Sequence, residues 1–176
     1  MEKIKYFLLF LIINLITFGK SIDSIKDITF EVEEKLYMNN DTKKSEYVIK
    51  YIKPDFIRKE VLKPELNKGE IYIYSEGKKI VYLPLFDQIS EENIVNGEDN
   101  TLESLNYIMK EKELKDGEMT LKNGITLKLE KLKKVSGYTL PESLTIYDGK
   151  IKVASLKIKN YRIDSNLNRE ELALHD

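Results

Sequence analysis

The sequence predicts a mainly β (α+β) protein, an incomplete antiparallel β-barrel or strongly curved sheet accompanied by one or two helices. Three observations support this class. Many short segments alternate apolar and polar residues, Asn-Gly and Asp-Gly pairs separate several of them, and only one segment has a convincing helical repeat. Nine or ten strands joined by short turns favour antiparallel neighbours, which suits one curved sheet or a partly closed barrel.

The first half of the chain predicts five strands. Ile28, Phe30 and Val32 alternate with polar residues, and the Asn-Asn-Asp run that follows supplies turn chemistry. Pro54 and Pro64 mark the ends of the third strand, because proline cannot donate a hydrogen bond to a neighbouring strand. The predicted strands cover residues 28–33, 46–53, 56–62, 70–75 and 79–83.

The second half predicts one helix and four further strands. Leu102, Leu105 and Met109 recur at helical spacing over residues 101–113, and Asn100 with Glu103 resembles a capping box. Asn-Gly and Asp-Gly pairs between alternating segments are strong signals for hairpin turns. The tail after residue 163 either forms a short helix or frays. The predicted strands cover residues 119–122, 125–132, 144–147 and 151–163.

Length and composition indicate one domain with a sizeable core. The chain has 176 residues, a formal net charge of −1, 34% charged residues and 41% hydrophobic residues. This charge balance gives no indication of nucleic-acid binding. The sequence has no cysteine, which excludes disulfides, thiolate nucleophiles, cysteine-based metal sites and a lipid-modified N-terminal cysteine.

The N-terminus has the pattern of a secretory signal peptide. Two lysines precede an apolar run over residues 6–18, and the small residues Gly19 and Ser21 follow. The run is shorter than the roughly 20 residues that span a membrane comfortably. We therefore expect residues 1–21 to be a signal peptide and residues 22–176 to form a single exported domain. An uncleaved N-terminal anchor is the alternative.

Some predicted strands carry large apolar side chains on both faces, whereas an antiparallel sheet usually has one polar face. Ile71 and Ile73 point away from Tyr72 and Tyr74, and Val48 and Ile52 point away from the tyrosines beside them. Both faces therefore need cover. The helix predicted over residues 101–113 either covers the second face completely, or covers it loosely and leaves a cavity for an apolar ligand.

The candidate cavity residues come from the two-faced strands and from the apolar stripe of the helix. One buried acyl chain would gain several kcal/mol there, at about 25 cal/mol per Å² of apolar surface. Such a site works by desolvation and needs no cofactor. The candidates are Val48, Ile52, Phe56, Ile71, Ile73, Ile80, Tyr82, Leu102, Leu105 and Met109.

The sequence has no recognisable catalytic or metal-binding pattern. His175 is the single histidine and lies next to the last residue, where a positioned, desolvated general base is not expected. Phosphate-binding loops, nucleophile elbows and metal-ligand spacings are missing from the sequence. A hydrolase that uses two carboxylates is a further alternative, although no spacing selects a pair. We expect neither enzyme activity nor a cofactor or metal.

Two sets of motifs in residues 51–90, Lys53-Pro54-Asp55-Phe56 with Pro64 and GKKIVYLP with Gln88, resemble those of the LolA-like periplasmic lipoprotein carriers. Lys53-Pro54-Asp55-Phe56, with Pro64 ten residues after the first proline, is similar to a basic-Pro start in that family. The segment GKKIVYLP over residues 77–84 resembles a family strand that begins Gly-Lys and ends in proline, and Gln88 follows four residues later. A looser likeness covers Leu140-Pro141 and residues 144–163.

The resemblance implies a half-barrel whose concave face is covered by lid helices and holds lipoprotein acyl chains. It implies a lipid-modified protein or another lipid as cargo, a periplasmic location, an inner-membrane releasing complex and an outer-membrane acceptor. Lys53 and Arg58 would be the lid contacts. Lys53 stands where the family has an arginine and lacks the planar fork of that side chain, and the family's tryptophan is missing. Since relatives of this fold include sensors, an envelope sensor or adaptor that acts through protein contacts is the alternative.

Overall fold

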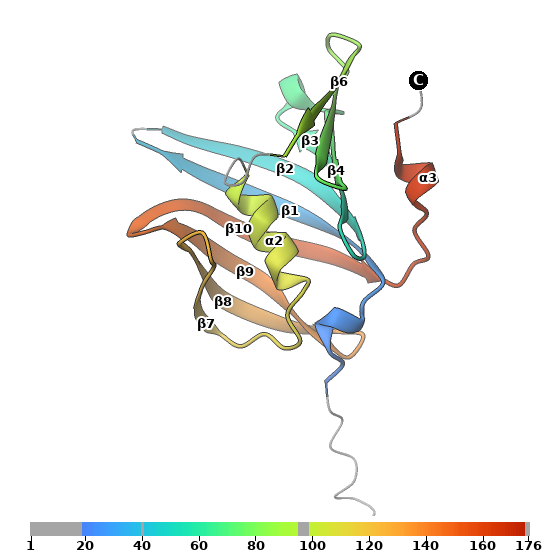
Figure 1. Cartoon of the computed structure of the whole chain (residues 1–176). Helices are drawn as coiled ribbons and strands as arrows, with labels where there is room; N and C mark the ends of the chain where they lie inside the picture. The colour runs from blue at the N-terminus through green and yellow to red at the C-terminus, as the bar shows by residue number, and fades with distance from the viewer. Residues whose placement is uncertain (1–18, 40, 95–98, 175–176) are drawn as a thin grey trace, which may run out of the picture.

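The computed structural model describes residues 19–39, 41–94 and 99–174. Most of the expected signal peptide, and His175, lie outside the described residues. Ten antiparallel strands form one open sheet in the order β6-β5-β4-β3-β2-β1-β10-β9-β8-β7 (Figure 1). The strands are β1 (Asp27–Met38), β2 (Asp41–Ile52), β3 (Phe56–Lys63), β4 (Ile71–Ser75), β5 (Lys78–Leu83), β6 (Gln88–Asn93), β7 (Gly117–Thr120), β8 (Ile125–Val135), β9 (Tyr138–Asp148) and β10 (Ile151–Ile163).

The predicted class, a mainly β protein with an open, curved antiparallel sheet, is confirmed. The nine predicted strands are all present, although β1, β2 and β9 are longer than predicted. The tenth strand, β6, was not predicted, because all six of its residues are exposed and most are polar. Two of the predicted hairpin turns join β7 to β8 and β9 to β10, and their glycines, Gly124 and Gly149, have φ of +85° and +56°, which suits glycine.

Helix α2 (Asn100–Ile108) crosses one face of the sheet (Figure 1). It begins at Asp99, whose side chain accepts a hydrogen bond of 3.0 Å from the backbone N–H of Leu102. The capping pair predicted from Asn100 and Glu103 is therefore wrong by one residue. The helix also ends earlier than the predicted residue 113, since the chain turns after Ile108 and brings Leu114 into the core, where it is 3% exposed.

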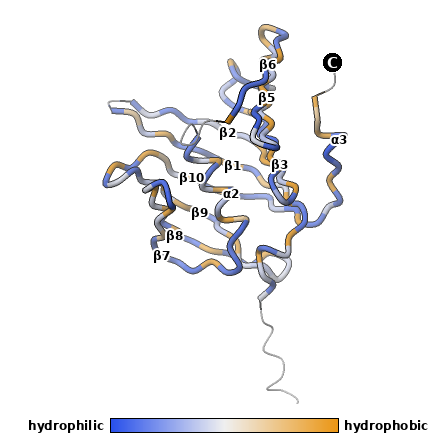
Figure 2. The backbone as a smooth tube through the Cα atoms, viewed as in Figure 1, coloured by the Kyte–Doolittle hydropathy of each residue, from blue (hydrophilic) through white to orange (hydrophobic). Residues whose placement is uncertain are grey.

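The main hydrophobic core lies between α2 and the face of the sheet that α2 covers, here called the concave face. Figure 2 shows apolar and polar residues alternating along the central strands, as a half-buried sheet requires. The largest fully buried side chains of this core are Tyr47, Tyr51, Ile22, Ile25, Ile28, Ile49, Leu127, Leu129, Leu140, Leu144, Ile146 and Leu156.

A second, smaller apolar cluster lies on the opposite face, here called the outer face. Phe56 and Ile73 pack there against Leu172 of α3 (Arg169–Leu172). The C-terminal segment that carries α3 is held to the sheet by Asp27, which is 5% exposed and accepts hydrogen bonds from the backbone N–H groups of Ser165 and Asn166. The described ranges also contain two one-turn 3₁₀ helices, η1 (Ile22–Ser24) and η2 (Glu65–Asn67).

Candidate apolar binding site

Helix α2 is the cover of the concave face and is attached to it mainly by apolar side chains. Leu102, Leu105, Ile108 and Met109 are each 2–5% exposed and belong to the main core. The helix is nine residues long, which is too short to be stable in isolation. Its position therefore depends on these contacts with the sheet, and losing them would uncover the apolar concave face.

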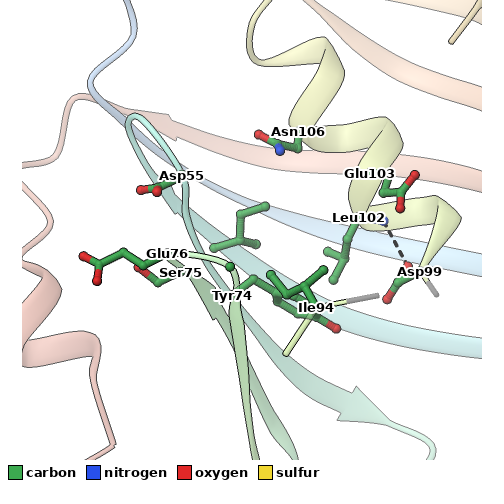
Figure 3. Close-up of a pocket in the computed structure, with 11 residues that line it drawn as sticks. Asp55, Tyr74, Ser75, Glu76, Ile94, Asp99, Leu102, Glu103 and Asn106 are labelled. Atoms are coloured by element: carbon green, nitrogen blue, oxygen red, sulfur yellow. Dashed lines mark hydrogen bonds between the residues drawn. The ribbon is translucent and has the colours of Figure 1, made fainter. Parts of the chain in front are cut away.

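A cavity of about 170 Å³ lies beside α2, at the tip of the β4–β5 hairpin. Ile57, Tyr74 and Leu102 contribute apolar lining, and Figure 3 shows Tyr74 and Leu102 approaching each other with Ile94 close by. Ligand sites for small molecules usually measure about 300–1,000 Å³. The cavity is thus large enough for a group of benzene's size, and an acyl chain would fit only if α2 moved.

The rim of this cavity is acidic. Its charged lining residues are all carboxylates: Asp55, Glu76, Asp99 and Glu103. Two cations compensate part of this charge from nearby. Arg169 forms an ion pair of 2.8 Å with Asp55, and Lys59 lies 4.0 Å from Asp99. Arg169 also lies 4.0 Å from Glu76, and Glu103 accepts a hydrogen bond of 2.7 Å from the side-chain amide of Asn123, so all four carboxylates have partners.

A buried polar cluster lies under the first turn of α2. Glu34 of β1 is 6% exposed and accepts hydrogen bonds from the hydroxyl of Thr101, at 2.6 Å, and from that of Ser45, at 3.0 Å. Tyr47 is 0% exposed and its hydroxyl has no hydrogen-bond partner. Burial raises the pKa of Tyr47 well above its ordinary value, and the negative charges of Glu34 and Asp99 add to this shift.

The structure divides the ten predicted cavity residues between the two faces of the sheet. Residues directly opposite each other on neighbouring strands share a face, and the pairs Arg58–Ile73 and Ile73–Ile80 place these side chains on the outer face. The other strand candidates share that face with them. The outer-face set is Val48, Ile52, Phe56, Ile71, Ile73, Ile80 and Tyr82.

The three helix candidates, Leu102, Leu105 and Met109, lie on the concave side in the main core. Of the ten candidates, Leu102 alone lines the cavity beside α2. The strand residues that do face α2 are their neighbours in sequence, such as Tyr47, Ile49 and Tyr51. The alternation predicted these two opposed sets correctly but contained no signal for which set faces the helix.

The two predicted lid contacts bind other parts of the chain. The Lys53 ammonium donates a hydrogen bond to the backbone carbonyl of Asp23 in η1. Arg58 lies on the outer face, and its guanidinium donates to the backbone carbonyl of Leu172 at 2.6 Å. Arg58 therefore holds the C-terminal segment against the outer cluster. Polar contacts between α2 and the sheet are made instead by Glu34, which accepts from Thr101, and by Lys59, which pairs with Asp99; the sequence analysis singled out neither.

Two further properties concern the described residues. No helix in the described ranges is both long and apolar enough to cross a membrane. Within the same ranges, no group of three or more histidine, aspartate or glutamate side chains is arranged to hold a metal ion.

Solved structures are similar to this chain in fold. A LolA superfamily protein from Nitrosomonas europaea aligns with a TM-score of 0.65 at 10% identity, over 87% of this chain and 94% of that chain. A DUF1329 family protein from Desulfovibrio piger ATCC 29098 gives 0.64 at 13% identity, with coverages of 86% and 91%. A putative outer membrane lipoprotein-sorting protein domain from Vibrio parahaemolyticus gives 0.60 at 13% identity, with coverages of 83% and 88%.

Comparison by sequence gives no further relatives, since neither the protein-family models nor the curated proteins searched include a match. The low identities mean that the structural likeness concerns the arrangement of strands and helices, and residue roles are not carried over with it. The alignments cover 83–87% of this chain with TM-scores of 0.60–0.65, so the likeness extends over most of the fold. The chain therefore has a LolA-like fold.

Proposed function

We propose that this protein is an exported carrier that binds the acyl chains of a lipid-modified polypeptide, or another lipid, between α2 and the concave face. It would carry this cargo across the periplasm toward the outer membrane. The observation that supports the proposal most directly is an apolar concave face crossed by the short helix α2, with a cavity already present beside that helix. The LolA-like fold is consistent with the same role.

The mechanism requires α2 to act as a movable lid. With the lid closed, a cavity of about 170 Å³ admits only the end of an acyl chain. Lifting the lid would expose the side chains of Leu102, Leu105 and Ile108 together with the sheet residues beneath them. An acyl chain in this seam would take the place of those contacts, so apolar surface would stay buried in both the closed and the loaded state.

Location and partners are part of the same proposal. Residues 1–21 would direct export and be removed, and N-terminal sequencing of the protein from a periplasmic fraction would then begin at Ile22. A releasing complex in the inner membrane and an acceptor in the outer membrane would load and unload the cargo. Retention of the first 21 residues in the exported protein would instead support the membrane-anchored alternative.

Cargo binding is tested on the purified mature domain. Organic extraction followed by mass spectrometry should detect co-purified lipid, and a fluorescent acyl probe should bind and then be displaced by unlabelled lipid. The hydrogen-exchange rates of the α2 backbone amides should change when the probe binds, because the lid must move to admit it. A protein that contains no lipid and binds no acyl probe would contradict the carrier proposal.

A second function, an envelope sensor or adaptor that acts through protein contacts, is favoured by a different observation. Three large apolar side chains are exposed at the end of β3, β4 and β5 that lies farther from the cavity beside α2. Leu66 is 75% exposed, Leu85 68% and Phe86 69%. They surround a hollow of about 450 Å³ between η2 and the turn after β5. Exposed apolar groups gathered at one place are typical of contact surfaces.

The adaptor alternative predicts a stable protein partner and no bound lipid. Cross-linking in cells followed by purification should capture the same partner with the native protein and lose it with Phe86→Ser. A matched control is Ile151→Ser, since Ile151 is also exposed (70%) but lies away from this hollow. Equal capture by native protein and both variants would exclude Phe86 as a contact residue.

A further inference from the structure

Glu34 is an unusual residue for the concave face. It follows Ile28, Phe30 and Val32 on the inward side of β1, at a position where this pattern would place another apolar side chain. It is nevertheless buried, and both of its carboxylate oxygens accept hydrogen bonds. A buried carboxylate is stabilised by partners that compensate for lost hydration, and removing one of them is costly.

The partners of Glu34 belong to different parts of the structure. Ser45 lies directly across from Glu34 on β2 and stays with the sheet, whereas Thr101 belongs to the first turn of α2. The cation of this region, Lys59, is held elsewhere: its ammonium lies 4.3 Å from the ring centroid of Tyr47 and 4.0 Å from Asp99. Glu34 therefore depends on hydroxyl donors, and the donor to its Oε1 atom, Thr101, is carried by the lid.

Lifting α2 would change the surroundings of Glu34. The hydroxyl of Thr101 would leave with the helix, and one carboxylate oxygen would lose its donor while facing the opened apolar seam. The hydroxyl of Tyr47 would stay on the sheet, close to the same carboxylate. The opened site would then have an apolar floor and a polar end that can accept a hydrogen bond and repels negative charge.

We infer that Glu34 selects the polar end of the ligand and that Thr101 occupies this position in the closed state. The preferred ligand is an acyl compound whose polar end donates a hydrogen bond and is neutral or positively charged. A free fatty-acid anion is disfavoured, because its carboxylate would lie against the carboxylate of Glu34 in the opened site. The inference rests on the proposed function, since it describes the specificity of the same site.

The test compares two probes that share one acyl chain, glycerol monolaurate and laurate, in displacement of a fluorescent acyl probe below their micelle concentrations. The native protein should bind glycerol monolaurate about tenfold more tightly than laurate, the effect of one unfavourable charge contact at a partly screened site. Glu34→Gln keeps the shape and removes the charge, so its two affinities should become nearly equal. Glu33→Gln is the matched control, because Glu33 lies on the same strand and accepts from Lys159 on the outer face.

Thr101→Val gives a readout that needs no ligand. It removes the hydroxyl that bonds Glu34 while keeping the shape of the side chain, so amide exchange in α2 should become several-fold faster. The affinities for both probes should rise together, and their ratio should stay close to the native value. Circular dichroism of each variant checks that the sheet is intact.

Each outcome decides a separate point. Equal or tighter binding of laurate by the native protein would overturn the selector role and leave the carrier proposal standing. If Glu34→Gln kept the native ratio of affinities for glycerol monolaurate and laurate, the selector role would also be overturned, and the carrier proposal would again stand. Failure of the native protein to bind either probe would contradict the proposed function, and the selector role with it. Unchanged exchange of α2 in Thr101→Val would overturn the role of Thr101 in closing the lid.

Discussion

Truncating one buried side chain on each face of the sheet separates lid contacts from structural contacts. Leu105 of α2 is 4% exposed in the main core, and Ile73 of β4 is 3% exposed in the outer cluster. Each alanine substitution removes three carbon atoms from a packed site and should lower the free energy of unfolding by about 2–4 kcal/mol. For a domain of this size, the melting temperature should fall by about 5–15 °C. Urea unfolding measures the free energy and thermal unfolding measures the melting temperature, both followed by circular dichroism.

The two variants should differ in ligand binding. Leu105→Ala weakens the attachment of the lid by about 2 kcal/mol, so the open state is populated roughly 30-fold more and the affinity for an acyl probe rises by up to that factor. Ile73→Ala leaves α2 and the concave face unchanged, so its affinity should stay within about twofold of the native value.

Two results would refute this reasoning. If Ile73→Ala changed the affinity as much as Leu105→Ala, the ligand would contact the outer face, or the two faces would be coupled. If Leu105→Ala destabilised the protein without altering the affinity, α2 would not move during binding. The comparison is informative because both side chains are almost fully buried. The two variants should therefore lose similar amounts of stability, and a difference in affinity between them reports the role of α2.

Three further predictions concern single polar groups. Asp99→Ala should lower the stability by about 1 kcal/mol through loss of the cap that accepts from Leu102, and Asp99→Asn should retain it. Asp27→Ala removes the acceptor for the N–H of Ser165, so amide exchange should accelerate in residues 164–174, with a loss of about 1–3 kcal/mol. Because the folded state raises the pKa of Tyr47 above its unfolded value near 10, the contribution of Tyr47 to stability should be constant below that pH and fall by about 1.4 kcal/mol per pH unit above it. In Tyr47→Phe, the free energy of unfolding should fall less steeply with pH above 10, by the equivalent of one proton. An unchanged slope would contradict a raised pKa for Tyr47.

The hairpins were predictable because their signals are local. An Asn-Gly or Asp-Gly pair between two alternating segments determines both the turn and the pairing of the strands it joins. Strand β6 has no such signal: it is polar and exposed, and it exists because β5 offers an unpaired edge. The end of α2 was not predictable for a related reason, since the chain leaves the helix to bury Leu114, a contact with the sheet rather than within the helix.

The candidate site shows the limit of periodicity more clearly. Alternation separates Ile71 and Ile73 from Tyr72 and Tyr74, and the structure confirms that separation. Which face of the sheet is covered by α2 depends on where the helix and the C-terminal segment pack. Both pack through contacts with strands that are distant in sequence. Glu34 was missed for the opposite reason, because a glutamate among alternating residues is typical of a solvated strand face.

The energetics of the lid relate the closed structure to the proposed carrier role. Lifting α2 uncovers Leu102, Leu105 and Ile108, at about 1.5–3 kcal/mol each, or about 5–9 kcal/mol together. Burying an acyl chain of about sixteen carbons gains about 12 kcal/mol at 0.8 kcal/mol per methylene. The three helix side chains alone offset a large part of this gain, and the uncovered sheet residues and the immobilised ligand offset more, so one chain alone would bind weakly and leave easily. A closed apolar lid therefore makes binding selective for large apolar cargo, and it allows a partner that stabilises either lid position to drive loading or release.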